Sequence, residues 1–281
     1  MDNSVNHIKP IYIREVFKGK NPSLGRLLPG FVYRYLEKII HQKELNDFIE
    51  RHGNKIGMDF VHAAIDEFAI KLTVEGIERV PRNGRFIFAS NHPLGGFDGM
   101  LMMDVLEKNF GEVKSLSNDL LMNITNLHPV LLPINKHGRQ DAEAAKVMEE
   151  YYLSSCQILT FPAGLVSRRI KGQIIDLEWK KNFITKAIYY KRDIVPVHIS
   201  GRNSEFFYRL ASIRKFFRIK ANLEMFYLVD ETFKHRNKAI IIKIGTPISY
   251  TQFDKSKKPI EWAKWVKEKA YALDGVTHIP F

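Results

Sequence analysis

One octet, Asn91-His-Pro-Leu-Gly-Gly-Phe-Asp98, constrains this chain more than any other segment. It follows an apolar run at 85–90 that is typical of a buried strand, and it precedes a helix-like run at 100–106. Two glycines let the backbone approach a ligand closely, and the start of a helix favours negative charge. Neutral histidine is the usual general base near neutral pH, and a nearby carboxylate can fix its tautomer. The octet therefore predicts a catalytic turn, with His92 as the base and Asp98 as its partner.

The same octet also fits a simpler interpretation. Asn-His-Pro is compatible with an ordinary loop, and Gly-Gly followed by Asp98 is compatible with a turn that Asp98 closes as a helix N-cap. These eight residues alone leave the catalytic and the structural interpretations open.

Length and composition limit the class of protein. The 281 residues suffice for one large α/β domain or two smaller ones, and an apolar content of 45% excludes global disorder. No apolar run approaches the ~18–20 residues that span a bilayer, and the N-terminus lacks the apolar core of a signal peptide. We therefore expect a cytoplasmic protein, either soluble or peripheral on the inner face of the cell membrane.

The formal net charge of +12 indicates an acidic partner. Phosphorylated substrates, an acidic carrier protein, an anionic membrane surface and nucleic acid all satisfy this condition. Nucleic acid is disfavoured, since the sequence has no helix-turn-helix, zinc or RNP-type signature and its charge is dispersed. The single cysteine, Cys156, excludes a disulfide framework and is expected to be a small buried residue. No metal or redox cofactor is expected.

The first 70 residues are predicted to form a helical, basic segment. Residues 1–30 are rich in Pro and Gly and are expected to be irregular with at most short helical turns. Residues 31–50 and 58–70 each have the apolar periodicity of a helix.

Residues 71–281 are predicted to form an α/β domain, packed with the N-terminal segment as one structural unit. Strands are expected at 71–74, 85–90, 113–116, 130–134, 158–161, 194–199 and 239–244, and helices at 98–110, 141–153, 180–190 and 259–273. This alternation predicts a mixed, mostly parallel sheet flanked by helices, with a site at the carboxyl ends of its strands.

Three further strand ends carry residues suited to binding anions. A turn with Lys136 and Arg139 follows one predicted strand, a turn with Ser167 and Arg168 follows the next, and Ser-Gly-Arg-Asn at 200–203 follows a third. Arginine side chains bind phosphate in two-point geometry. Each turn alone is a weak signal, but the four strand ends together form a more specific pattern.

In their order, these four segments resemble the motifs of the glycerolipid acyltransferase superfamily, which contains the 1-acylglycerol-3-phosphate acyltransferases. That family has Asn-His-x-x-x-x-Asp, a block ending near an arginine, Phe-Pro-Glu-Gly-x-Arg-Ser, and an apolar run around Val-Pro-Val. The similar segments here lie at 91–98, 132–139, 161–168 and 194–199. The resemblance covers roughly residues 70–250.

Two departures from the family pattern affect the first and third motifs. Five residues rather than four separate His92 and Asp98, so the loop must bulge by one residue. Ala163 stands where the family has a glutamate that organises the acceptor or phosphate site, which argues against a lysophosphatidate-type acceptor. The variant motifs resemble the bacterial hemolysin-like branch, which is associated with O-acylation of amino-acid lipids such as lyso-ornithine or lyso-glycine lipids.

The resemblance implies a peripheral membrane O-acyltransferase that moves a fatty acyl chain from acyl-CoA or acyl carrier protein to the hydroxyl of a lyso-lipid. His92 and Asp98 would be catalytic, and backbone N–H groups near Gly95–Gly96 or Gly164 would hold the oxyanion. The implied substrate-binding residues are Asn91, Gly95, Gly96, Lys136, Arg139, Phe161, Pro162, Gly164, Ser167 and Arg168. The alternatives are a lysophospholipid acyltransferase with a phosphate-bearing acceptor, and a non-catalytic basic protein that binds lipid or nucleic acid.

A membrane contact is predicted separately, at residues 202–220. Glu205 is the one acidic residue of this segment, and an apolar stripe recurs at helical spacing in Phe206, Leu210, Ile213 and Phe217. Its six basic residues are Arg202, Arg209, Arg214, Lys215, Arg218 and Lys220. Such a helix can lie at an anionic membrane surface, although the same stripe is compatible with packing on the core. The basic N-terminal stretch is a second candidate.

Overall fold

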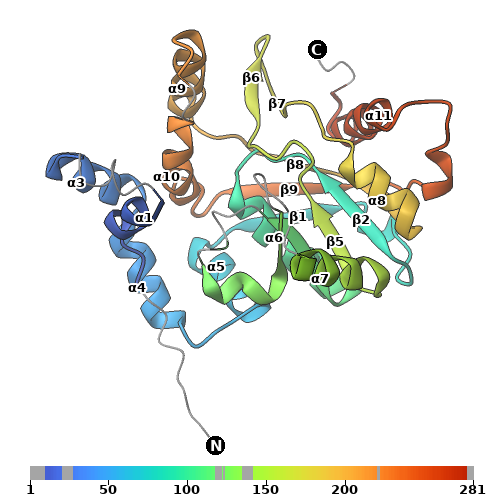
Figure 1. The fold of residues 1–281 in the computed structure, drawn as a ribbon, viewed down its shortest axis with the longest axis horizontal. Helices are drawn as coiled ribbons and strands as arrows, with labels where there is room; N and C mark the ends of the chain where they lie inside the picture. Colours follow the sequence, from blue (N-terminus) through green and yellow to red (C-terminus); the bar gives the residue numbers. More distant parts are fainter. Residues whose placement is uncertain are drawn as a thin grey trace, which may run out of the picture.

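A predominantly parallel sheet forms the centre of the molecule (Figure 1). The computed structural model describes residues 10–20, 28–117, 122, 124–134, 142–219 and 222–276. Within these residues the main sheet has seven strands in the order β1-β9-β8-β2-β5-β3-β4. Their bounds are β1 Lys71–Glu75, β2 Phe86–Ser90, β3 Val113–Ser117, β4 Leu131–Pro133, β5 Gln157–Thr160, β8 Asp193–Ile199 and β9 Ala239–Ile244.

The strand directions bring the carboxyl ends of several strands to one edge of the sheet. Strands β8, β2, β5, β3 and β4 run parallel, whereas β9 is antiparallel to β8 and parallel to β1. All five residues of β2 are buried, as expected for a central strand covered on both faces. The carboxyl ends of β2, β5 and β8 therefore meet at the same edge, which confirms the predicted mixed, mostly parallel sheet.

Helices cover both faces of the sheet. Leu101 of α6 (Gly96–Phe110) and Val61 of α5 (Met58–Phe68) belong to the same core cluster as Phe88 of β2. The neighbouring Ile87 belongs to a second cluster, because successive residues of a strand point to opposite faces. That second cluster is formed with α7, α8 and α11, which span Ala142–Leu153, Asn182–Tyr190 and Pro259–Ala272.

The N-terminal helices depart from the sequence prediction. Residues 13–20 form helix α1 (Ile13–Lys20) where only short turns were expected. The single helix predicted at 31–50 is two helices, α3 (Gly30–Ile39) and α4 (Gln42–His52). His41 separates them in the left-handed conformation, with φ +49°, and its ring stacks on Phe233 of α10 (Leu228–Phe233). A long-range contact thus ends a helix that local periodicity would continue.

The boundary between residues 70 and 71 stays a prediction. Phe48 of α4 and Phe60 of α5 share a core cluster with Leu101 of the α/β part. The N-terminal segment therefore packs on the sheet through apolar side chains.

The loop expected after β5 contains a small hairpin. Strands β6 (Arg168–Ile170) and β7 (Gln173–Ile175) pair antiparallel through a turn in which Lys171 and Gly172 both have positive φ. Figure 1 shows this hairpin projecting between α9 (Glu205–Phe216) and α11.

Two further expectations concern membrane spans and Cys156. No helix in the described ranges is both long enough and apolar enough to cross a membrane. Cys156 is buried as expected, and burial raises the pKa of its thiol to about 12. The thiol is therefore protonated and unreactive near neutral pH.

A buried arginine stabilises the end of the sheet opposite the site. The guanidinium of Arg192 donates to the backbone carbonyls of Tyr152 (2.8 Å) and Cys156 (2.7 Å). It also donates to the carbonyls of Ser154 (2.7 Å) and Tyr151 (2.9 Å). One side chain thereby satisfies the backbone between α7 and β5.

Replacing Arg192 by leucine should lower the free energy of unfolding by about 3 kcal/mol or more, because each buried carbonyl left without a donor costs about 1–3 kcal/mol. Urea denaturation measures the loss, and Lys255→Leu at an exposed position is the control. A loss below about 1 kcal/mol would mean that water replaces the guanidinium.

Candidate active site

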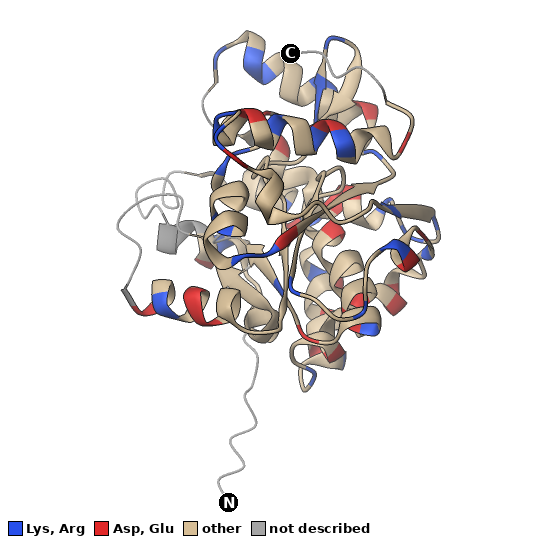
Figure 2. Ribbon diagram, turned by 90° about the vertical axis from the view of Figure 1, so that its right-hand side faces the viewer, with Lys and Arg blue, Asp and Glu red and all other residues tan. Residues whose placement is uncertain are grey.

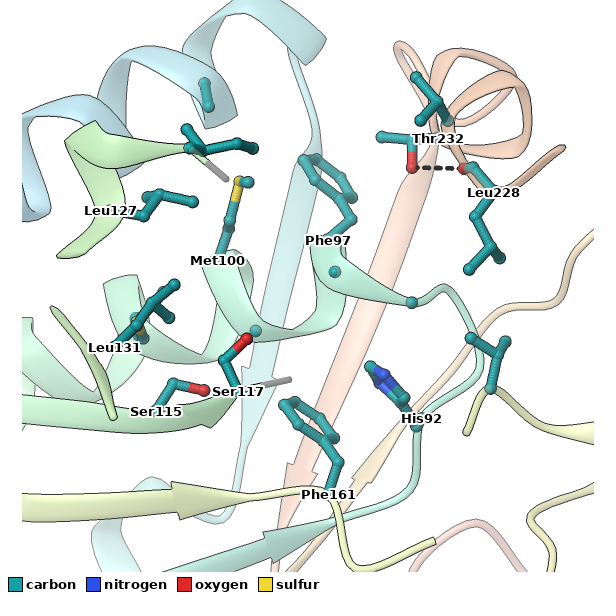
Figure 3. A pocket seen from close by; sticks show the side chains of 18 of the residues that line it. His92, Phe97, Met100, Ser115, Ser117, Leu127, Leu131, Phe161, Leu228 and Thr232 are labelled. Carbon is teal, nitrogen blue, oxygen red and sulfur yellow. Dashed lines mark hydrogen bonds between the residues drawn. The ribbon is translucent and has the colours of Figure 1, made fainter. Parts of the chain in front are cut away.

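His92 and Asp98 meet at the carboxyl end of β2. The imidazole Nδ1 of His92 lies 3.0 Å from Oδ2 of Asp98, within hydrogen-bond distance. The extra residue between them is accommodated in the turn that precedes α6, so the longer spacing does not separate the pair. With Nδ1–H donating to the carboxylate, Nε2 keeps a lone pair that can accept a proton. Figure 3 shows the His92 ring directed into a cavity beside Phe161, and the two rings stack with centroids 4.3 Å apart.

Asp98 contacts the backbone as well as the ring of His92. Its Oδ2 also accepts hydrogen bonds from the backbone N–H groups of Leu94 (2.8 Å) and Gly95 (3.1 Å). The bond from Gly95 caps the start of α6. The contact with His92 that the catalytic interpretation requires and the N-cap of the structural interpretation are therefore both present. Burial raises the pKa of Asp98 although the hydrogen bonds from His92 and Leu94 favour its charged form.

The glycines of the turn have different uses. Gly95 has φ +85° and ψ −143°, a conformation that essentially only glycine adopts, and its N–H is committed to Asp98. The N–H of Gly164 is likewise committed, to the carbonyl of Phe161 at 2.9 Å. Both N–H groups were candidate oxyanion donors. Because each already donates to an oxygen of the protein, neither is available for that role. Gly96 is the first residue of α6, where backbone N–H groups have no partner inside the helix. It is the remaining candidate from the sequence.

The backbone of His92 is held by the chain that follows β5. Its N–H donates to Oδ1 of Asp176 at 3.2 Å, and its carbonyl accepts from the N–H of Ser167 at 2.8 Å. The hydroxyl of Ser167 donates to the same oxygen of Asp176 at 2.6 Å. Ser167 therefore supports the catalytic turn from behind and does not line the cavity.

Asn91 joins two strand ends. Its side-chain amide donates to the carbonyl of Ile199 at 2.9 Å, and its carbonyl oxygen accepts from the N–H of Ile199 at 2.7 Å. Asn91 is buried and lies outside the cavity lining. The substrate contact implied for Asn91 is thus replaced by a clamp between the ends of β2 and β8.

The cavity at His92 has a volume of about 650 Å³. Gly95, Gly96, Phe161, Pro162 and Gly164 line it, as the motifs implied. The part behind Phe161 is apolar, and Figure 3 shows Met100, Leu127 and Leu131 around it. Phe48 and Phe60 of the N-terminal helices and Leu228 and Phe233 of α10 complete the apolar lining. The turn that carries His92 thus opens onto a predominantly apolar space.

Arg168 does not face the cavity. It is buried, and its guanidinium donates to Oε1 of Glu224 at 2.9 Å and to the carbonyl of Val166 at 2.7 Å. Desolvation lowers the pKa of Arg168, and the charge of Glu224 opposes that shift. The expected substrate-phosphate contact of Arg168 is therefore corrected to a buried ion pair. Arg169 is paired with Glu205.

The other two expected cations, Lys136 and Arg139, lie outside the described residues. Within them, three basic side chains line the cavity, namely Arg51, Lys180 and Arg236. Both arginines pair with Glu67, at 3.0 Å and 2.8 Å. Lys180 is exposed and has no carboxylate partner among the described residues. Its backbone N–H donates to the carbonyl of Pro162 at 3.1 Å, which places it on the turn after β5.

Ala163 is a buried apolar site. It belongs to the core cluster of Trp179, Phe183 and Ile184. A glutamate here would place its carboxylate among aromatic rings, so the alanine agrees with the surrounding packing.

Asp176 and Lys180 escaped the sequence interpretation because neither belongs to a recognised motif. The signal available was an acidic residue and a lysine on either side of a tryptophan, shortly after the third motif.

The sequence is similar to a known protein family and to known proteins. Residues 15–278 match the family described as Acyltransferase. The chain is 47% identical over 264 residues to a lyso-glycine lipid O-acyltransferase of Bacteroides thetaiotaomicron, covering 94% of this chain and 97% of that protein. It is also 47% identical over 264 residues to a lyso-glycine lipid O-acyltransferase of Phocaeicola vulgatus, covering 94% and 95%.

A solved structure, the 1-acyl-sn-glycerophosphate acyltransferase PlsC from Thermotoga maritima, aligns with a TM-score of 0.47 at 15% identity, over 95% of this chain and 90% of that one. From the family match and the two relatives, the chain belongs to the acyltransferase family, within the glycerolipid acyltransferase superfamily that its motifs resemble, and is an enzyme that transfers acyl groups.

Proposed function

We propose that this enzyme transfers a fatty acyl chain from an acyl thioester to the hydroxyl of a lyso-glycine lipid at the membrane surface, with His92 as general base. The observation that carries the proposal is the His92–Asp98 pair at the entrance of an apolar cavity. The names of the two relatives support the acceptor. The thioester would be carried by CoA or by an acyl carrier protein, whose acidic character suits a chain of net charge +12.

The proposed reaction begins with proton transfer. Nε2 of His92 takes the proton of the acceptor hydroxyl while its oxygen attacks the thioester carbonyl, and a C–O bond forms. Asp98 stabilises the imidazolium through Nδ1. Collapse of the tetrahedral intermediate breaks the C–S bond, and the leaving thiolate takes the proton back from Nε2. The N–H of Gly96 lies at the positive end of α6 and has no hydrogen-bond partner among the described residues, which supports stabilisation of the oxyanion.

The apolar part of the cavity supports binding of an acyl chain. Its lining comes from α4, α5, α6 and the region around β4, and it lies beside the ring of Phe161 that contacts His92. A chain buried there would place its carbonyl near the base. Burial of each methylene contributes about 0.8 kcal/mol, so hydrocarbon length directly affects binding.

Lys180 supports recognition of a carboxylate on the acceptor. A glycine joined to a lipid through its nitrogen keeps a free carboxylate. Lys180 lines the same cavity as His92, and a Cβ placed on Gly164 would stand 3.6 Å from its Nζ. The ammonium group therefore lies over the turn that follows β5. Lys180 takes the place of Arg168, which the motifs suggested for an anion and which pairs with Glu224.

An exposed apolar surface on α9 supports attachment to a membrane. Helix α9 packs on the core through Phe207, Tyr208 and Ala211, whereas the predicted stripe points outward. At the end of the helix Phe216 is 80% exposed and Phe217 67% exposed. Arg209, Lys215 and Arg218 are exposed beside them, but Arg214 is not a free cation because it pairs with Glu224 at 2.8 Å.

The apolar surface continues onto α3. Tyr227 hydrogen-bonds through its hydroxyl to Tyr35 of α3, and its ring contacts Phe206 of α9 with centroids 4.9 Å apart. Phe31 and Tyr35 are both more than half exposed. Elsewhere Figure 2 shows Lys and Arg interleaved with Asp and Glu over the visible face. The surface on α9 and α3 combines exposed aromatic side chains with exposed cations, which suits a membrane interface better than nucleic acid.

Replacing His92 by alanine should reduce kcat by about 10²–10⁴-fold, the usual contribution of a general base. Asp98→Asn should lower kcat more than it changes KM, because Asp98 acts on His92 and not on the substrate. The assay follows thiol release from an acyl thioester with a lyso-glycine lipid, and with 1-acylglycerol-3-phosphate for comparison. Activity of His92→Ala within a few-fold of the wild type would contradict the mechanism. Faster turnover of the phosphate-bearing acceptor would contradict the substrate.

Replacing Lys180 by glutamine should raise KM for the lyso-glycine lipid about tenfold, since a charge-assisted hydrogen bond contributes about 1.5–3 kcal/mol. KM for the acyl donor should change little. Lys181→Gln is the matched control, because Lys181 is also exposed but does not line the cavity. The methyl ester of the acceptor should bind both forms equally. An unchanged KM in Lys180→Gln would show that Lys180 does not contact the carboxylate.

The variant R209Q/K215Q/R218Q should bind anionic vesicles about 100-fold more weakly than the wild type, because each cation near such a surface contributes about 1 kcal/mol. Phe216→Ser with Phe217→Ser should also weaken binding, through loss of apolar insertion. Activity on a soluble short-chain acceptor should remain. Tyr189→Ser, at a 73% exposed aromatic residue on α8, is the control. Vesicle sedimentation of both variants at the wild-type level would exclude α9 as the anchor.

A further inference from the structure

A second buried carboxylate, Asp176, lies against His92. Its Oδ1 accepts hydrogen bonds from the His92 N–H at 3.2 Å and from the Ser167 hydroxyl at 2.6 Å. Its Oδ2 accepts from the indole N–H of Trp179 at 2.9 Å. We call these three contacts the Asp176 clamp. Asp176 is fully buried, so every donor to its carboxylate has a large effect on its energy.

Asp176 is itself fixed by the C-terminal helix. Its backbone N–H donates to the hydroxyl of Tyr271 at 2.7 Å, and its carbonyl accepts from Nζ of Lys267 at 2.7 Å. The same ammonium donates to the carbonyl of Leu177 at 3.2 Å. Both Tyr271 and Lys267 belong to α11 and are buried. Backbone and side chain of Asp176 are therefore held in one position, which is what a support for a catalytic group requires.

The Asp176 clamp completes the immobilisation of His92. Residues 91–95 lie in neither a helix nor a strand, so no regular backbone ladder holds them. The N–H of His92 is fixed by Asp176, its carbonyl by the N–H of Ser167, and its Nδ1 by Asp98. Ser167 joins the first two contacts, because its hydroxyl also binds Asp176. Loss of Asp176 would leave Asp98 as the main restraint on the imidazole.

We propose that Asp176 is a positioning residue for acyl transfer, which holds His92 so that Nε2 faces the acceptor hydroxyl. This inference rests on the proposed role of His92 as the base. Misplacement of a reacting group by about 1 Å can cost about 100-fold in rate, whereas substrate affinity depends on other parts of the cavity. Asp176 therefore acts on kcat without contacting the substrate. A residue that only stabilised the fold would change the unfolding temperature and leave kcat of the folded enzyme intact.

The test compares Asp176→Asn with Ser167→Ala in the full chain. Asp176→Asn should lower kcat by about 10–100-fold, with KM for both substrates within about threefold of the wild type. Ser167→Ala keeps the carboxylate and its contact with Trp179, and it should lower kcat by about three- to tenfold. The double variant should lose less than the product of the two single losses, since Ser167 and Asp176 interact directly through one hydrogen bond. All rates are measured well below the unfolding temperature of each variant.

Glu231→Gln provides a matched structural control. Glu231 is a buried carboxylate that also accepts from a serine hydroxyl, that of Ser204 at 2.6 Å, and from the backbone N–H of the same serine. It lies on α10 and does not line the cavity. This variant should lower the unfolding temperature as Asp176→Asn does, with kcat within about threefold of the wild type.

Two results would overturn the inference. One is a kcat of Asp176→Asn within about threefold of the wild type, and the other is an equal loss of kcat in Glu231→Gln. If Asp176→Asn does not fold, a wild-type kcat of Ser167→Ala overturns it instead. His92→Ala is assayed beside them. Activity in that variant would remove the proposed base itself, whereas an inactive His92→Ala with a fully active Asp176→Asn would remove only the role of Asp176.

Discussion

The arrangement of this site depends on one buried oxygen, Oδ2 of Asp98. Three N–H groups converge on it, from the His92 ring and from the backbone of Leu94 and Gly95. A carboxylate without solvent is costly, and burial does raise the pKa of Asp98. The donors offset that cost and, by doing so, fix the base, the turn and the start of α6 together. Gly95 is required because only glycine adopts the backbone conformation that directs its N–H to this oxygen.

The sheet supplies the second constraint, because parallel strands bring distant segments to one edge. Asn91 follows β2, Pro162 follows β5 and Ile199 ends β8, and hydrogen bonds join the first and third of these positions. The turn after β5 then presents Phe161 to the ring of His92. The fold thus places the ring of Phe161 against the imidazole of His92 and the buried carboxylate of Asp98 at its Nδ1.

Sequence patterns predicted contacts between residues that are close in the chain. They failed where a residue's role depends on a partner far away in the sequence. The His92–Asp98 contact was predictable because Asp98 follows His92 by only six positions, and the sheet was predictable from the alternation of short apolar runs. The role of Arg168 was not predictable, because its partner Glu224 lies 56 residues away and belongs to no recognised motif. The break at His41 has the same cause, since it packs on Phe233. Lys136 and Arg139 fall outside the described residues, so their expected anion contacts stay predictions.

Charge in this protein serves two purposes that composition cannot distinguish. The net charge of +12 suggests many free cations, yet several of the basic residues form ion pairs or hydrogen bonds inside the fold. Arg168 and Arg214 share Glu224, and Arg192 binds only backbone carbonyls among the described residues. Each arginine that is paired inside the fold is one cation fewer that can bind a substrate or a lipid. Among the described residues, Lys180 is the unpaired cation that lines the cavity, and the exposed cations of α9 lie beside exposed aromatic side chains. We therefore expect anion recognition to depend on the few cations that the fold leaves without a carboxylate partner, and not on the total charge.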